Sequence, residues 1–248
     1  MRLNPRRTNI GPRRHLPFDI LYEDGDVIAI DKPAGLLATH TRLHGRAARE
    51  AQPTAENYLN SYLRKGQAKS RKSVSLVHRL DRDTSGVMIF AKSRRVAEAF
   101  RADWAAVTEK RYLALVEGEM EAERGSYTSF LKEDSDGYRV RSVPSGTPGA
   151  KRARTDWEAA GFRSGLSLVR ILLKSGRKNQ IRVQFADAGH PVAGDAKYGG
   201  RKSSRLQLHS AFLAFRHPRD GRRVEVASRM EFPAAPAAAA GRARRSEA

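Results

Sequence analysis

Side chains that could do acid–base or nucleophilic chemistry are concentrated in one short stretch of the sequence. The hexapeptide HRLDRD, residues 78–83, contains a histidine, two arginines and two aspartates. It lies between two apolar runs, Ser75–Val77 and Val87–Ala91, that have the composition of buried strands. Nearby positive charge favours the charged form of a carboxylate, so the flanking arginines should keep Asp81 ionised. An anion fixed on a loop between strands can act as a nucleophile or as a base.

The same loop allows a purely structural interpretation. Asp81 would then be an ion-paired turn residue, and the local sequence supports this about as well as it supports catalysis. Asp83 precedes Thr84-Ser85-Gly86, which is typical of a turn whose side-chain oxygens bind nearby backbone N–H groups. We therefore expect chemistry, if there is any, at Asp81.

Two other motif interpretations fail. HRLD resembles the catalytic loop of protein kinases, but the sequence has no Asp-Phe-Gly, no glycine-rich phosphate loop and no VAIK strand. His40 and His44 stand four positions apart, a spacing that suits a metal on a helix, yet there is no HExxH motif and no obvious third ligand. We interpret these histidines as polar loop residues and expect no metal site.

Composition restricts the class of protein. The 248 residues carry 47 Lys and Arg against 27 Asp and Glu, a formal net charge of +20, which points first to nucleic acid as the partner and second to an acidic membrane surface. The sequence has neither a long apolar span nor a basic amphipathic anchor, and no signal peptide, so no membrane role is expected. Cysteine is absent, which excludes disulfides and thiolate chemistry. A cytoplasmic protein, monomeric because of its high net charge, is the expectation.

The elements that would position the loop alternate between strands and short helices. An Asp24-Gly25 turn predicts a hairpin between Ile20–Tyr22 and Val27–Ile30. Helical spacing predicts helices over 54–63, 93–107 and 181–188, and further strands are predicted at 112–116, 155–160, 168–173, 206–215 and 223–226. This pattern predicts a single α+β domain with a mixed, mainly antiparallel β-sheet flanked by helices and loops.

Domain organisation follows from composition along the chain. Residues 1–17 form a basic N-terminal segment, 18–233 the folded domain, and 234–248 an Ala- and Arg-rich tail expected to be disordered. Within the domain, residues 40–72 and 134–150 are polar segments that we interpret as insertions suited to mobile loops that could order on RNA, and for 134–150 a plain flexible surface fits the sequence equally well.

Five blocks of the sequence, in order, resemble the RluA-type pseudouridine synthases. HRLDRDTSG resembles that family's signature, and ILYEDGDVIAIDKPAGLLA (20–38) resembles its first block, which ends in a Lys-Pro-x-Gly turn. EKRYLALVEG (109–118), SGRKNQIRVQFADAGHPVAGDAKYGG (175–200) and LQLHSAFLAFRHP (206–218) resemble the later blocks. The resemblance spans roughly residues 20–232.

The resemblance implies roles for individual residues. Asp81 corresponds to the family's catalytic aspartate, Tyr112 to its active-site tyrosine and Arg182 to the arginine that pairs with the aspartate, by a single or a bidentate charge-assisted bond. Where the family has Gly-Arg-Thr-His-Gln, this chain has Gly-Arg-Lys-Asn-Gln at 176–180, which puts an additional phosphate-binding charge at Lys178. The residues expected to bind RNA are His78, Arg79, Arg82, Lys32, Arg177, Lys178, Asn179 and Gln180.

The resemblance also implies the activity, which is isomerisation of specific uridines to pseudouridine in ribosomal or transfer RNA after the base has been flipped out. Neither cofactor nor metal is expected, and the bases to be modified cannot be identified from the sequence. Too few residues precede the first block for the S4-type RNA-binding domain that many relatives carry. The alternative is a non-catalytic RNA-binding or ribosome-assembly protein that retains the fold. The presence of Asp81, Tyr112 and Arg182 together argues against that alternative.

Overall fold

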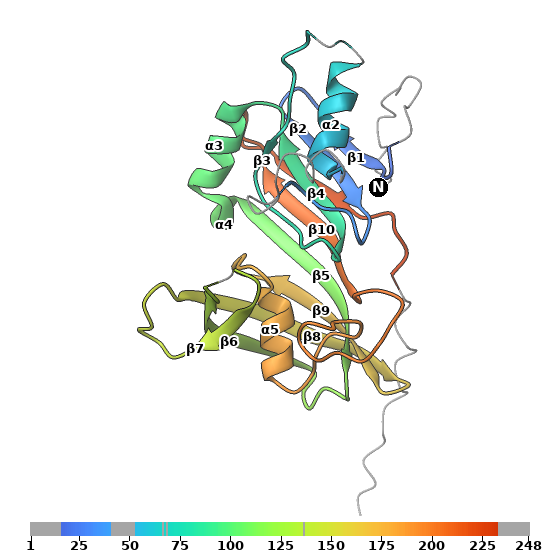
Figure 1. The fold of residues 1–248 in the computed structure, drawn as a ribbon, viewed down its shortest axis with the longest axis vertical. Coiled ribbons are helices and arrows are strands. Elements are labelled where there is room, and N and C mark those ends of the chain that lie inside the picture. Colours follow the sequence, from blue (N-terminus) through green and yellow to red (C-terminus); the bar gives the residue numbers. More distant parts are fainter. Residues whose placement is uncertain (1–15, 41–52, 66, 68, 136, 233–248) are drawn as a thin grey trace, which may run out of the picture.

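One large twisted sheet runs through the whole molecule (Figure 1). The computed structural model describes residues 16–40, 53–65, 67, 69–135 and 137–232. Within these residues the sheet contains the strands β1 (Ile20–Glu23), β2 (Val27–Lys32), β3 (Ser75–Leu76), β4 (Ser85–Ala91), β5 (Thr108–Glu117), β6 (Arg124–Glu133), β7 (Val140–Val143), β8 (Lys151–Arg163), β9 (Leu166–Leu173), β10 (Leu208–Arg216) and β11 (Arg223–Ala227).

The strand order explains how distant parts of the sequence meet. The order is β1-β2-β4-β10-β5-β9-β8-β6-β7, with β3 beside β4 and β11 beside β10. Neighbouring strands are antiparallel except β4 and β10, which are parallel. The sheet is therefore mixed and mainly antiparallel, as predicted. The late strand β10 lies between β4 and β5. The start of β4 and the part of β5 that carries Tyr112 are therefore only one strand apart.

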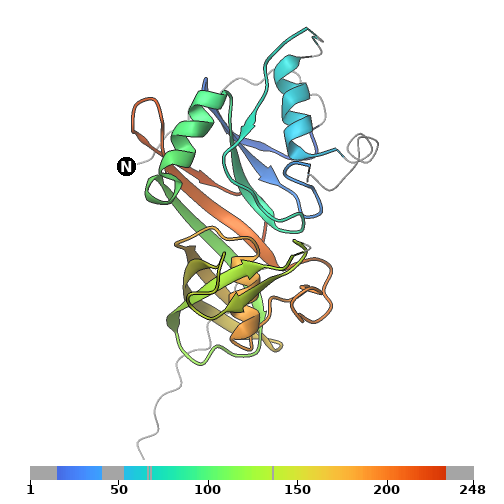
Figure 2. The ribbon, with the colours of Figure 1, turned by 60° about the vertical axis from the view of Figure 1, so that its left-hand side comes forward.

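Helices cover both faces of this sheet. The helices α2 (Ala55–Arg64) and α5 (Gln180–Asp187) pack on one face, where Leu59 and Phe185 are fully buried in the same apolar cluster. Helix α3 (Arg94–Ala102) buries Phe100 on the opposite face. Figure 2 shows α2 and α5 on one side of the sheet and α3 on the other. The active-site loop belongs to the first of these faces, between the two helices.

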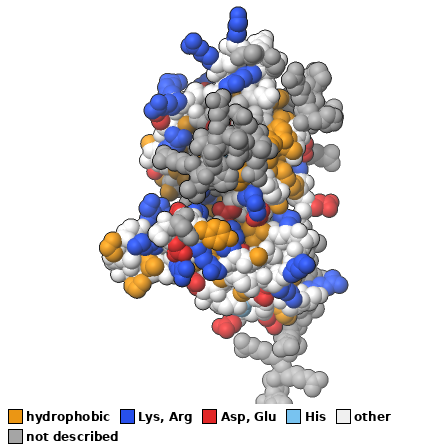
Figure 3. All heavy atoms as spheres, viewed as in Figure 1, with side chains coloured by type: hydrophobic (Ala, Val, Ile, Leu, Met, Phe, Trp, Pro, Cys, Tyr) orange, Lys and Arg blue, Asp and Glu red, His pale blue; other side chains and the backbone are white. Residues whose placement is uncertain are grey.

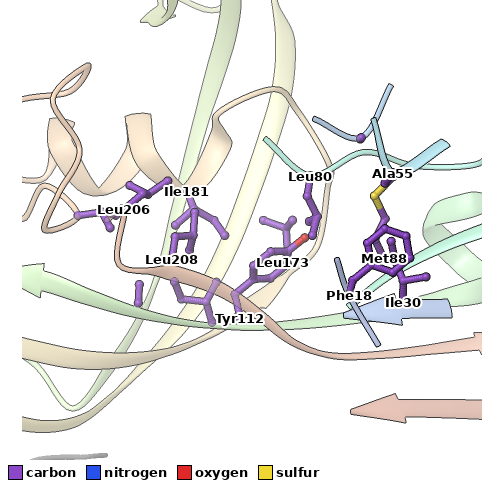
Figure 4. Close-up of a cluster of buried hydrophobic side chains, with 14 of the residues drawn as sticks. Phe18, Ile30, Ala55, Leu80, Met88, Tyr112, Leu173, Ile181, Leu206 and Leu208 are labelled. Atoms are coloured by element: carbon purple, nitrogen blue, oxygen red, sulfur yellow. The ribbon is translucent and has the colours of Figure 1, made fainter. Parts of the chain in front are cut away.

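The larger core cluster reaches directly to the functional region. Tyr112, Leu173 and Leu208 pack together at its centre, and Leu80 of the HRLDRD loop extends it towards Met88 (Figure 4). Leu80 is only 7% exposed, so this side chain anchors the loop in the core while its charged neighbours face outward.

The structure differs from the sequence prediction in three places, one of which is β6, a strand that the sequence analysis did not predict. The helix expected over 93–107 is two helices, because Asp103 leaves the helical conformation (φ −144°, ψ 39°) and α4 (Trp104–Val107) starts again from its carbonyl. The polar segment 134–150, interpreted as a mobile insertion, contains β7, which pairs with β6. The prediction was wrong there because β7 is short and mostly exposed, so alternation gave no clear signal.

Several predicted segments fall partly or wholly outside the described residues. The tail 234–248 and most of the basic segment 1–17 lie outside them. The predicted insertion 40–72 contains α2, whose N-cap Thr54 accepts a hydrogen bond from the backbone N–H of Asn57, while 41–52, 66 and 68 are not described. No helix in the described residues is long and apolar enough to cross a membrane.

Candidate active site

The HRLDRD loop connects β3 to β4 and is held close to the neighbouring strand β10. Gly86, just after the loop, has a positive φ of +110°, and a Cβ there would lie 2.2 Å from the carbonyl oxygen of Ser210. Only glycine permits this conformation and this approach of two backbones. The glycine of the motif therefore fixes the end of the loop against β10.

Asp81 is held by two side chains from the far end of the sequence. Its Oδ2 accepts a hydrogen bond from Nδ2 of Asn179 at 2.6 Å and one from Nη1 of Arg182 at 3.1 Å. Asn179 adopts the left-handed conformation (φ 52°) directly before α5, and Arg182 lies in the first turn of that helix. Both bonds reach the same oxygen. Among the described residues no hydrogen bond is made to Oδ1 of Asp81, and Asp81 lines both cavities described below.

Arg182 is buried and pairs with a second carboxylate that the sequence analysis missed. Its Nε and Nη2 donate to Oδ2 and Oδ1 of Asp195 at 2.6 and 2.7 Å. The bidentate bond of Arg182 is thus made to Asp195, and its bond to Asp81 is single. Burial acts to lower the pKa of Arg182, but the hydrogen bonds and charges of Asp195 and Asp81 outweigh it and raise the pKa above its usual range. Asp195 therefore orients the cation that orients Asp81.

Tyr112 forms the floor of the site. It is 7% exposed on β5 and lies among Leu173, Leu208 and Leu80 (Figure 4). Burial, together with the negative charge of Asp81, raises the pKa of Tyr112 to about 12, although contact with Ser210 acts in the opposite direction. At neutral pH the phenol is therefore protonated, and the ring presents an aromatic surface beside the carboxylate.

His78 is a neutral, fixed part of the cavity wall. Its Nε2 accepts a hydrogen bond from the backbone N–H of Ile89 at 3.0 Å, and its ring stacks on Trp104 with centroids 4.8 Å apart. Burial, with a smaller effect of the nearby Lys110, lowers the pKa of His78 to about 3. Since Nε2 is an acceptor, the ring proton lies on Nδ1.

Lys32 lies inside the protein and not on an RNA-facing surface as expected. Its side chain is fully buried, and its Nζ donates to the carbonyl oxygens of Pro33, Leu36 and Arg82 at 2.8–2.9 Å. Burial lowers the pKa of Lys32 to about 8, against the charges of Asp83 and Asp81. All three N–H groups are used by the protein, so Lys32 ties the Lys-Pro-x-Gly turn to the Asp81 loop.

The arginines next to Asp81 in sequence form no ion pair with it among the described residues, whereas the sequence interpretation had them beside its charge. Arg82 pairs with Asp83, with Nε 3.0 Å from Oδ1, and both side chains are exposed. Arg79 is exposed and lines the cavities on either side of the loop. Consecutive side chains on an extended loop point in different directions, so adjacency in sequence did not give contact in space.

The segment 177–180 serves both the cavity and the fold. Arg177 is exposed, with its Nε bound to the carbonyl of Arg152 at 3.1 Å. Lys178, expected as a free phosphate-binding charge, is 2.9 Å from a carboxylate oxygen of Glu133. Gln180 is buried, and its amide bonds Ser175, Thr155 and main-chain groups. The structure thus gives Gln180 a bracing role where a substrate contact was expected.

Two adjoining cavities open on either side of Asp81. One has a volume of about 410 Å³ and is lined by Asp81, Tyr112, His78 and Trp104, and the other, about 950 Å³, lies between Asp81 and the 194–206 segment. Cationic side chains outnumber acidic ones in their walls: Arg79, Arg82, Lys110, Arg177, Lys178, Arg182, Lys197 and Arg205 against Asp81, Asp83, Glu133 and Asp195. Figure 3 shows Lys and Arg side chains gathered around the middle of this face. The surroundings of Asp81 favour an anionic ligand.

The arrangement can support carboxylate chemistry on a nucleotide-sized group. An oriented aspartate faces a cavity with an aromatic floor, and cations that can hold phosphates surround it. The structure brings Asp81, Tyr112 and Arg182 together, and it places Asn179, which was expected to contact RNA, against Asp81. Within the described residues, no cluster of three or more His, Cys, Asp or Glu side chains could hold a metal ion. Fold and site together give a domain in which an oriented carboxylate lines cavities whose walls carry more cationic than acidic side chains.

Comparison with known proteins identifies the family. Residues 26–187 match the family described as RNA pseudouridylate synthase, and the chain belongs to it. Members of this family are enzymes that isomerise uridine to pseudouridine. The chain is 36% identical over 207 residues to the RNA pseudouridine synthase YhcT of Bacillus subtilis, which covers 81% of this chain and 65% of that protein. The chain thus spans slightly less than two thirds of that relative.

In two further comparisons, the match covers a larger share of the other protein. The tRNA pseudouridine synthase C of Haemophilus ducreyi is 30% identical over 238 residues, or 87% of this chain and 92% of that protein. The human RNA pseudouridylate synthase domain containing 1 has a similar structure, with a TM-score of 0.65 and 27% identity over 88% of this chain and 86% of that chain. The single-domain synthase fold that the sequence resemblance implied is confirmed.

Proposed function

We propose that this chain isomerises uridine to pseudouridine in structured RNA, with Asp81 as the reacting carboxylate. The observation that carries this proposal is the position of Asp81, pinned through one oxygen by Asn179 and Arg182 in a cavity that Tyr112 also lines. Family membership supplies the reaction class, and this geometry supplies the residues.

The reaction breaks the N1–C1′ bond of the target uridine, turns the freed uracil, and forms a C5–C1′ bond. The proton lost from C5 is balanced by the proton gained at N1, so the product is an isomer of the substrate. The Asp81 anion either attacks C1′ or removes a proton from the sugar, and both routes need a carboxylate that is ionised and correctly aimed. Arg182 is the counter-ion of this carboxylate at 3.1 Å, and Asn179 restricts its rotation. Each bond leaves the second oxygen of Asp81 available to the sugar.

Tyr112 holds the uracil while it turns. Its buried ring gives the base an aromatic surface to stack on after the glycosidic bond is broken. A base role for Tyr112 in removing the C5 proton is disfavoured, because its pKa of about 12 keeps the phenol protonated at neutral pH. Stacking is therefore the role that we assign to Tyr112.

The target uridine must leave its helix to reach Asp81, and unstacking costs a few kcal/mol. Contacts between the cationic walls and the RNA backbone offset that cost. Arg79 is exposed at the junction of both cavities, where it can fill the gap that the flipped base leaves, while the fixed ring of His78 lines the pocket.

The substrate class that we propose is transfer or ribosomal RNA. One relative, matched over nearly its full length, is a tRNA pseudouridine synthase. Transfer RNA is therefore the first substrate to test. The net charge of +20 agrees with a protein that works on RNA in the cytoplasm as a monomer, since the charge opposes self-association.

The test is chemical mapping of pseudouridine in total RNA from cells that lack the gene, after incubation with wild-type protein, Asp81→Asn or Asp103→Asn. Asp103 is exposed and makes no side-chain cap bond to α4, so its variant controls for the loss of one surface charge. We expect new pseudouridines with the wild type and Asp103→Asn and none with Asp81→Asn. Isomerisation by Asp81→Asn would refute the role of Asp81. A wild type that binds RNA but modifies none would instead favour a ribosome-assembly role.

A further inference from the structure

A second cationic residue faces the smaller cavity from the floor that carries Tyr112. Lys110 precedes Tyr112 by two positions on β5, so both side chains point to the same face of the sheet. Lys110 is 4% exposed and belongs to the cavity lining. Glu109 and Arg111, between and beside them, point to the opposite face, where Glu109 pairs with Arg223. Strand geometry thus directs Lys110 into the site.

The ammonium group of Lys110 has no hydrogen-bond or salt-bridge partner within the described residues. A buried charge without a partner is costly, so such a group calls for a ligand. The other titratable and charged groups that share its cavity are His78, Arg79, Asp81, Tyr112, Glu133, Arg177, Lys178 and Arg182. His78 is neutral, Glu133 is bound by Lys178, and Asp81 by Arg182. None of the three is left to neutralise Lys110.

Arg177 brings a second unneutralised cation to the same wall. Its charge lies close enough to act on Lys110, and its Nε is fixed by the carbonyl of Arg152 at 3.1 Å. The two terminal nitrogens of the guanidinium are therefore left for a ligand, on a side chain already oriented for it. Two converging cations without a carboxylate match an oxyanion with several acceptor oxygens, and RNA offers such a group in each phosphate.

We propose that Lys110 and Arg177 form a subsite for one backbone phosphate of the RNA, at or next to the flipped uridine. The inference rests on the proposed function and adds a substrate contact to it. In this subsite the phosphate replaces the missing counter-ion, so the two cations hold the nucleotide in the cavity while Asp81 acts on its sugar. The cost of burying Lys110 in the free protein is recovered only when RNA is bound.

The protonation of Lys110 gives the proposal a distinctive signature. Burial, and then repulsion from Arg177, lowers the pKa of Lys110 in the free protein to about 8. The phosphate binds only the protonated form, so binding to the wild type should weaken as the pH rises through 8. Arginine at this position stays charged throughout that range.

The experiment measures the affinity of a stem–loop RNA, containing a uridine mapped in total RNA as above, for wild type, Lys110→Met, Lys110→Arg and Arg177→Gln at several salt concentrations. At pH 7 we expect Lys110→Met to bind about tenfold more weakly and with a slope of log K against log salt reduced by roughly one. Lys110→Arg should restore the slope. Between pH 7 and 9 the wild type should lose about tenfold in affinity that Lys110→Arg retains.

Two results would overturn the subsite. The first is a salt slope in Lys110→Met equal to that of the wild type, which would mean that Lys110 touches no phosphate. The second is an equal loss of affinity with pH in Lys110→Arg. Thermal unfolding of Lys110→Met separates a misfolded variant from a weak binder, and Arg177→Gln, which changes an exposed residue, tests the site independently. Failure of the proposed function is seen separately, as absence of pseudouridine from the wild-type reaction.

Discussion

Replacing Asp195 by asparagine tests whether the site depends on a residue that acts through Arg182. Oδ1 of Asp195 accepts from Nη2 of Arg182 and from the backbone N–H groups of Lys197 and Tyr198, so the oxygen of the new amide will take that position. The amide NH₂ then occupies the Oδ2 position, 2.6 Å from Nε of Arg182. Two donors face each other there, and the buried arginine loses the charge of one partner.

The size of the effect follows from these contacts. One charge-assisted hydrogen bond is worth about 1.5–3 kcal/mol, and breaking a buried pair costs about 3–5 kcal/mol. Because one bond of Arg182 to position 195 survives, we expect the free energy of unfolding to fall by ~2–4 kcal/mol. Arg182 will shift away from the new NH₂ and weaken its single bond to Asp81, which should lower kcat by about 10–100-fold, or ~1.4–2.8 kcal/mol.

The assays are urea unfolding and single-turnover pseudouridine formation at saturating enzyme. Glu158→Gln is the matched control, because Glu158 also pairs with an arginine, at 3.3 Å, but both partners are exposed. Its unfolding free energy should change by less than ~1 kcal/mol and its kcat not at all. An Asp195→Asn protein with wild-type stability and wild-type kcat would refute the claim that Asp195 positions Arg182.

Three further predictions follow from contacts near the loop. Asn179→Gly preserves the left-handed backbone and removes the bond to Asp81, so kcat should fall about tenfold in single turnover, and unchanged kcat would contradict the role of the amide. Lys32 binds fewer protons in the folded state than in the unfolded state between its pKa of about 8 and its usual 10.5, so stability should rise with pH there. In urea titrations at pH 8 and 10, the Lys32→Met variant should show about half of the wild-type rise in stability, because Lys110, whose pKa is lowered in the same way, supplies the other half. An undiminished rise would contradict the lowered pKa of Lys32. Gly86→Ala places a Cβ 2.2 Å from a backbone oxygen, so it should abolish folding or lower the free energy of unfolding by more than ~3 kcal/mol, measured by circular dichroism. Near-native stability would show that β10 can move away from β4.

The sequence predicted well what depends on local pattern. Alternation and helical spacing identified the strands around the site and the helix that carries Arg182, since these elements bury regular apolar faces. It failed for β6 and β7, whose outward faces carry too many polar residues to show alternation. Lys110 was passed over although period two places it on the same face as Tyr112, so the signal was available.

The contacts of the site were harder to predict because they join residues far apart in sequence. Asp81 is 101 positions from Arg182 and 98 from Asn179. The family resemblance paired Asp81 with Arg182, but proximity in sequence suggested Arg79 and Arg82 as its charge-setting neighbours, and neither forms an ion pair with it among the described residues. Asp195 lies in a loop that offers no periodicity, and only the folded structure shows that it faces Arg182. Lys32 was interpreted as a surface cation, because the sequence around it does not show that every residue of β2 is buried.

The central place of β10 also bears on the order in which the protein can assemble during synthesis. β10 joins β4 to β5, yet it is made after all the other strands except β11. Until residue 216 has left the ribosome, β4 and β5 both expose unpaired edges, and such edges recruit other chains. Folding must also wait for contacts of long sequence separation, which slows it. A nascent chain stalled before β10 would therefore be both inactive and prone to aggregate.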